Sequence, residues 1–101
     1  MDDLQKEHHR LSGMFVELSN TMKAEGHDQN MVLSALTNAT ATYATYCLAG
    51  NEGYLYEAGI NQVCERFRTN LEVLQGLKKA EYARNNPEAA AAAEAEDQQK
   101  S

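Results

Sequence analysis

The feature that most constrains this chain is a run without charged side chains, residues 29–49, between Asp28 and Gly50. Its large apolar residues recur on more than one face at helical spacing, without the alternation of a strand. A helix that is apolar around most of its circumference is normally buried. We therefore predict a buried helix over residues 29–49. Its threonines can donate their hydroxyls to carbonyls one turn back: Thr37, Thr40, Thr42 and Thr45.

Two segments with helical periodicity flank this run. Residues 3–25 carry an apolar stripe at spacings of three and four, formed by Leu4, His8, Leu11, Phe15, Leu18 and Met22. Residues 54–82 carry a second stripe, formed by Ile60, Val63, Phe67, Leu71, Leu74 and Leu77. Gly26 and Asp28 are typical of a helix stop and a new N-cap, and Gly50 and Gly53 suit the next chain reversal. Helices joined by short corners normally pack as neighbours, so we expect an all-α, three-helix antiparallel bundle with the second helix at its centre.

The bundle is predicted to end before Pro87, because proline disfavours helical dihedrals in the residue that precedes it. Residues 88–97 are rich in alanine and glutamate and contain no large apolar side chain. A short alanine-rich helix is marginal by itself in water. The sequence thus predicts a helical domain over residues 1–84 and a low-complexity tail over residues 85–101, disordered or transiently helical.

The charge balance excludes two broad classes of partner. Nine basic and fifteen acidic residues give the chain a formal net charge of -6. That sign disfavours binding to nucleic-acid phosphates or to anionic lipid headgroups. The acidic N-terminus has neither the basic start nor the apolar run of a secretory signal, and no stretch is apolar enough to span a bilayer. We expect a cytoplasmic protein with no nucleic-acid or membrane partner.

No residue pattern indicates a catalytic, metal or cofactor site. Cys47 and Cys64 lie in helical patterns without CxxC spacing, so we interpret them as buried reduced thiols. His8 and His9 point about 100° apart on a helix and do not share one face, which leaves a half-buried His8 and an exposed His9. The sequence names no catalytic residue, no cofactor and no metal ligand.

Tyrosines gather where the second helix ends and the third begins: Tyr43, Tyr46, Tyr54 and Tyr56. Their rings could close the end of a three-helix core, line a small-molecule pocket, or form an interface. A three-helix unit would leave part of the uncharged second helix without cover, and a second copy could supply that cover about a two-fold axis. We expect such an interface near Tyr43, Tyr46, Leu48 and Tyr54.

Three short stretches resemble a family of short, mostly proteobacterial proteins known only as a domain of unknown function. Residues 15–20, Phe-Val-Glu-Leu-Ser-Asn, are similar to the family's Phe-Ile-x-Leu-Ala-Asn opening, and residues 64–72 are similar to its Glu-Gln-aromatic-Arg and Asn-Leu stretch. Residues 39–44 keep the small residues and the aromatic of its central helix, but Thr42 stands where the family usually has arginine. The resemblance covers about residues 10–75 and implies a bacterial helical protein. It implies no activity and no functional residue.

Abundant apolar helical surface and the absence of convergent polar residues favour a protein-interaction or self-associating scaffold module, either a homodimer or the binder of another protein. The alternative is a metal-binding or small-molecule-binding protein, or an enzyme, with its site between helices.

Overall fold

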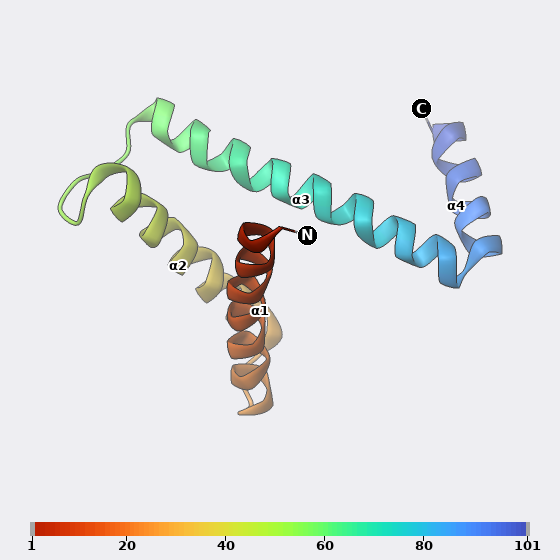
Figure 1. The fold of residues 1–101 in the computed structure, drawn as a ribbon, viewed down its shortest axis with the longest axis horizontal. Helices are drawn as coiled ribbons and strands as arrows, with labels where there is room; N and C mark the ends of the chain where they lie inside the picture. The colour runs from red at the N-terminus through yellow and green to blue at the C-terminus, as the bar shows by residue number, and fades with distance from the viewer. Residues whose placement is uncertain (1, 101) are drawn as a thin grey trace. The chain divides into compact units, whose positions relative to one another are not determined.

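The structure is a computed structural model that describes residues 2–100, with side chains for residues 2–98. The described residues form four helices and no strand: α1 (Asp3–Ala24), α2 (Gln29–Ala49), α3 (Glu57–Asn85) and α4 (Pro87–Lys100) (Figure 1). The all-α class is confirmed, with four helices where the sequence indicated three. The chain divides into two compact units, Met1–Leu55 and Tyr56–Ser101, which are described separately.

Both helices of the first unit begin at an aspartate cap. Asp2 accepts a hydrogen bond from the backbone N–H of Gln5 at 2.8 Å, and the Gln5 side chain accepts one from the Asp2 N–H at 3.0 Å. Asp28 accepts from the N–H groups of Asn30 and Met31 at 3.0 and 3.2 Å, as its position in the sequence predicts. These bonds satisfy N–H groups that have no partner within the helix.

The corner between α1 and α2 depends on Gly26. Its φ is +104°, a conformation that glycine adopts without steric cost. The N–H of Gly26 donates to the Lys23 carbonyl at 3.0 Å, and the N–H of His27 donates to the Met22 carbonyl at 3.2 Å. This pair of bonds is the Schellman ending of a helix, and it reverses the chain into α2.

Contact between α1 and α2 is tightest at this corner. Val32 is the one buried hydrophobic residue among those described, at 8% exposure. Three half-buried residues also lie near the corner: Ser19, Met22 and Leu36. All four lie within about three turns of the corner, so the two helices cover each other only at their joined ends.

The loop after α2 closes against the end of that helix. Gly50 has a φ of +80°, and a Cβ on Gly53 would collide with the carbonyl oxygen of Ala49. Leu55 is half-buried at the end of this loop, as are Ala44 and Ala49 in α2. Glycine at 53 therefore lets the backbone pass directly beneath the last turn of α2.

The second unit pairs α3 with α4. Pro87 occupies the first position of α4, where its fixed φ suits a helix, and the alanines that follow have the highest helix propensity. Ala83 and Ala90 are half-buried, and the Nζ of Lys79 lies 3.5 Å from the Oε1 of Glu94. Within the predicted tail, Pro87–Lys100 thus form a helix beside the end of α3.

Several expectations about burial are wrong. Most of α2 is exposed, although its lack of charge predicts a buried helix, and Cys47 and Cys64 are exposed thiols. His8 is exposed rather than half-buried. The cause is the same throughout: apolar periodicity marks the face that a helix can bury, but the contacts within each unit cover only a small part of those faces.

Candidate functional site

The two helices of the first unit present apolar inner faces, the faces that meet at the corner and are open beyond it. On α2 this face follows the helical repeat outward from the corner through Val32, Leu36, Ala39, Tyr43 and Tyr46. Along it, exposure rises from 8% at Val32 to 71% at Tyr43 and 47% at Tyr46. The α2 inner face therefore continues uncovered well past the helix that covers its beginning.

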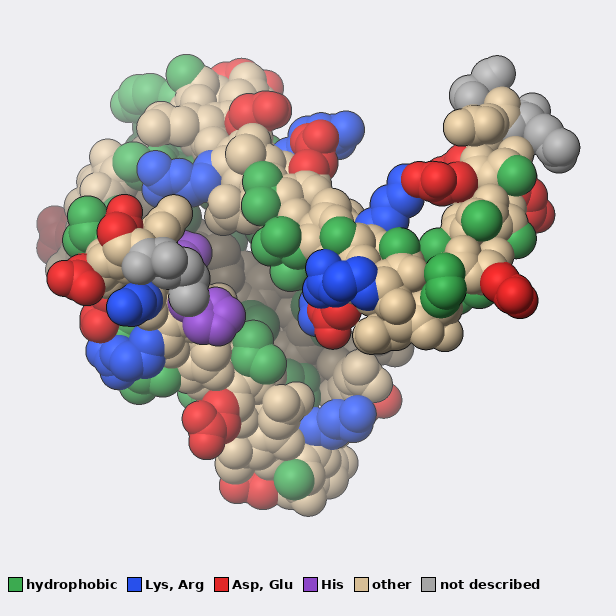
Figure 2. Space-filling model, turned by 45° about the vertical axis from the view of Figure 1, so that its right-hand side comes forward, with side chains coloured by type: hydrophobic (Ala, Val, Ile, Leu, Met, Phe, Trp, Pro, Cys, Tyr) green, Lys and Arg blue, Asp and Glu red, His purple; other side chains and the backbone are tan. Residues whose placement is uncertain are grey.

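The inner face of α1 behaves in the same way. Met22 is half-buried beside the corner, and Leu18, Phe15 and Leu11 follow it along one stripe. Phe15 is 62% exposed and Leu18 is 53% exposed. Hydrophobic side chains reach the surface among charged ones in the space-filling view (Figure 2). Since exposed apolar patches mark interaction sites, these two inner faces together are the candidate site.

The threonine hydroxyls of α2 are already satisfied within the helix. Each of its four threonine hydroxyls donates to the carbonyl four residues earlier, at 2.8–2.9 Å: Thr37 to Leu33, Thr40 to Leu36, Thr42 to Asn38 and Thr45 to Ala41. The bonds predicted from the sequence are thus confirmed. Because no hydroxyl proton on these threonines needs water, α2 can be buried against a partner at little cost in lost hydrogen bonds.

The four residues predicted for an interface do not share one face. Tyr43 and Tyr46 lie together on the α2 inner face, whereas Leu48 is two residues beyond Tyr46 and points to the other side of the helix. Tyr54 lies in the loop after α2 and is 71% exposed. The structure brings together Tyr43 and Tyr46 and leaves Leu48 and Tyr54 apart from that stripe.

Sequence reasoning missed Leu11, Phe15 and Leu18 as candidate site residues, because it assigned the whole stripe of residues 3–25 to the core. The available signal was the length of that stripe. It runs from Leu4 to Met22, but a corner at Gly26 brings only the adjacent turns of the two helices into contact.

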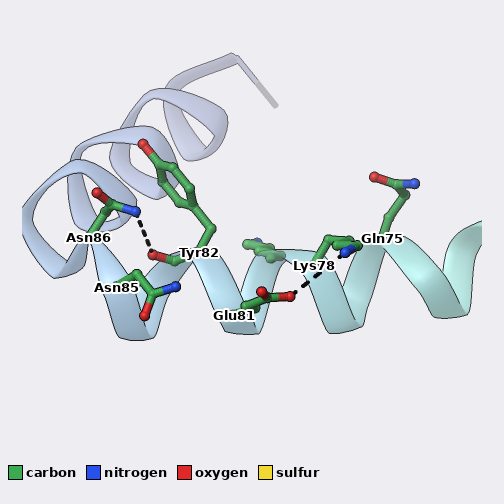
Figure 3. Close-up of a pocket in the computed structure, with 7 residues that line it drawn as sticks. Gln75, Lys78, Glu81, Tyr82, Asn85 and Asn86 are labelled. Carbon is green, nitrogen blue, oxygen red and sulfur yellow. Dashed lines mark hydrogen bonds and ion pairs between the residues drawn. The ribbon is translucent and has the colours of Figure 1, made fainter. Parts of the chain in front are cut away.

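A shallow hollow in the second unit lies where α3 meets α4. It is lined by Gln75, Lys78, Lys79, Glu81, Tyr82, Asn85 and Asn86 (Figure 3). Asn86 donates to the Tyr82 carbonyl at 3.3 Å, and Lys78 lies 3.8 Å from Glu81. Every one of these residues is exposed. Water therefore competes for each polar group, and the lining lacks the apolar walls typical of small-molecule sites.

The ionisable groups converge on no centre. Within the part of the chain that the structure describes, no three His, Cys, Asp or Glu side chains are grouped to hold a metal ion. On α1, the Nη2 of Arg10 lies 2.6 Å from the Oε1 of Glu7. This hydrogen bond raises the pKa of Arg10 above its ordinary value. Both partners lie on one exposed turn, so the pair is a surface ion pair of a kind that adds little to stability.

None of the helices in the described part of the chain is both long and apolar enough to cross a membrane. Compared with known protein families, with curated proteins and with solved structures, the chain matches none.

Proposed function

We propose that this chain is a protein-interaction module that self-associates, most simply as a two-fold dimer, through the inner faces of α1 and α2. The observation that carries the proposal is the exposure of Phe15, Leu18, Tyr43 and Tyr46 on the same stripes that are covered at the corner. These stripes have helical periodicity and so are suited to pack against other helices.

The energetics of the first unit support a covering partner. Burial of one valine side chain stabilises a fold by about 1.5–3 kcal/mol. Fixing the backbone costs about 1–2 kcal/mol for each ordered residue, before backbone hydrogen bonds return part of it. With Val32 as its one buried hydrophobic residue, the α1–α2 pair has little to offset that cost. Covering the exposed part of both inner faces would supply the missing apolar burial.

Light scattering across a dilution series tests this proposal. We expect the mass of a dimer at high concentration, with dissociation on dilution. Tyr46→Glu places a charge in the interface and should give the monomer mass. Tyr82→Glu is the matched control, since Tyr82 is 50% exposed against 47% for Tyr46 but lies on α3 in the other unit. A monomer mass for the unaltered protein at every concentration would reject self-association.

Three further expectations belong to this proposal. The bundle prediction makes α3, with its apolar stripe, the alternative cover for the same faces, and a monomer mass at every dilution would favour it over a second copy. The short stretches that resemble the proteobacterial family support a bacterial source. A location in the cytoplasm is the third expectation.

The second candidate is a small-molecule or metal-binding protein, or an enzyme, with a site between helices. The hollow between α3 and α4 is the one feature in its favour, and its polar side chains could contact a ligand. Its exposed lining makes it the weaker proposal. Metal analysis of the purified protein tests the metal-binding form: a stoichiometric ion that is lost on Glu81→Gln would favour it over self-association alone.

A further inference from the structure

We infer that α2 pairs antiparallel with α2 of a second copy of this chain, with the two-fold axis between residues 42 and 43. The inference rests on the proposed self-association and specifies which helix meets which, in what direction and in what register. Its starting point is the part of the α2 inner face beyond Leu36, where Ala39, Tyr43 and Tyr46 follow one another without cover from α1.

Charge identifies the occupant of this face as another α2. Residues 29–49 include no Asp, Glu, Lys, Arg or His, whereas α1, α3 and α4 all carry charged side chains. The apolar stripes of α1 and α3 are flanked by charged side chains, so either helix brings ionic groups to the borders of a contact with α2, which offers them no opposite charge. Among the described helices, α2 is the one that meets α2 with no charged side chain even at the borders of the contact.

Hydrogen bonding supports the same occupant. The hydroxyls of Thr40 and Thr42, which border the inner face, already donate to backbone carbonyls at 2.9 Å. The threonine hydroxyls of two such helices can therefore be covered by each other without leaving a threonine donor unsatisfied.

The register follows from the sizes of the side chains. On one face of α2, Tyr46 lies two turns beyond Ala39, and Tyr43 lies between them. An axis between residues 42 and 43 sets the large ring of each Tyr46 over the small Ala39 of the other copy. It also brings the two Tyr43 rings together beside the axis, where offset stacking is favourable. Large side chains then meet small ones at both ends of the contact, which is how close-packed helices interdigitate.

The same register leaves room for α1. The pairing spans residues 37–48, which begin just beyond Leu36, the last half-buried residue of the α2 inner face. The exposed Phe15 and Leu18 on the α1 inner face are then placed to pack along the flank of the second α2. Two copies thus form a four-helix arrangement in which the inner faces of both α1–α2 pairs are covered.

A charge-pair experiment on the full chain tests the register. Ala39→Glu and Tyr46→Lys each put an unpaired charge into the contact, and each should weaken dimerisation by about tenfold or more. The double variant A39E/Y46K sets opposite charges against each other across the interface twice, and should dimerise about tenfold more tightly than either single variant. Parallel pairing would put like charges together, so the double variant would then be the weakest of the three.

A cross-link gives a second measurement that does not depend on charge. In a chain with Cys47→Ser and Cys64→Ser, Tyr43→Cys should form a disulfide-linked dimer under mild oxidation, because residues beside the axis bring their Cα atoms within disulfide reach. Leu48→Cys, on the other side of α2, is the control and should remain monomeric on a denaturing gel. Circular dichroism of each variant checks that helix content is unchanged.

These results distinguish the antiparallel α2 register from self-association itself. A dimeric unaltered protein with no recovery in A39E/Y46K, or with no cross-link through Tyr43→Cys, overturns the register and leaves self-association standing. An unaltered protein that is monomeric at every concentration overturns both. Recovery in the double variant together with the specific cross-link establishes the antiparallel α2 pair.

Discussion

Tyr43 lies on the same face of α2 as Val32, about three turns farther from the corner, yet it is 71% exposed where Val32 is 8% exposed. The two residues define where the contact between α1 and α2 ends. An exposed aromatic that continues a buried stripe differs from a scattered surface residue, because the stripe gives it a defined direction and neighbours on both helices. The opening between these two positions is the reason to place the interface on the inner faces.

The first prediction concerns Val32. Val32→Ala removes two buried methyl groups and should lower the free energy of unfolding by about 1.5 kcal/mol. The neighbouring Leu33 is 61% exposed, so Leu33→Ala should change the free energy of unfolding by less than about 0.5 kcal/mol. Urea unfolding at one fixed protein concentration measures both. Equal losses would mean that Leu33 is covered by something outside the described contact.

The second prediction concerns two glycines with opposite roles. Gly26 has a φ of +104°, so Gly26→Ala should destabilise the protein by about 1–2 kcal/mol. Gly13 lies inside α1, and a Cβ there would meet nothing within 4 Å. Gly13→Ala should therefore stabilise the protein by about 0.5–1 kcal/mol through helix propensity. Thermal unfolding followed by circular dichroism measures the sign of the stability change for each variant. A loss of stability on Gly13→Ala would show that a partner helix approaches α1 closely at that point.

The third prediction concerns α4. Its described side chains include no large apolar group, and its ion pair with α3 joins Lys79 and Glu94, side chains that are 66% and 62% exposed. Exposed pairs of this kind contribute at most about 1 kcal/mol. A chain that ends at Asn86 should therefore keep the oligomeric mass, and its melting temperature should fall by no more than about 4–8 °C. Lys79→Gln in the full-length chain is the control for the ion pair alone. A lower mass for the shortened chain would place α4 in the interface.

Much of the local structure could be predicted because its signals are local. Asp28, Gly26 and Gly50 fix caps and reversals through their own dihedral preferences and hydrogen bonds, and helix α2 begins and ends as predicted. The start of α3 was placed at residue 54, three residues before Glu57. No side-chain cap is present there to mark the boundary.

Burial could not be predicted in the same way. The periodicity of α2 and of residues 3–25 identifies which face is apolar. Whether that face is buried by the same chain or by a partner depends on tertiary contacts, which periodicity does not specify. Cys47 illustrates the error: its helical setting suggested a buried thiol, and it is exposed on α2. Composition reveals the tyrosine cluster. The helix geometry of α2 is needed to show that Tyr43 and Tyr46 share one face and that Leu48 lies on the other side.

The last prediction concerns salt, and it follows from the absence of charge on α2. Raising sodium chloride from 0.1 to 1 M shortens the screening length from about 10 Å to about 3 Å, which weakens contacts between exposed ions. Because residues 29–49 contribute no charge, the dissociation constant of the dimer should change by less than about threefold. Mutual repulsion between chains of net charge -6 is screened as well, so any small change should favour association. Sedimentation equilibrium at both salt concentrations measures the constants. The double variant A39E/Y46K is the control, since a contact that depends on introduced charges should weaken as salt rises. A strong weakening of the unaltered dimer would instead show that ion pairs outside α2 hold the two copies together.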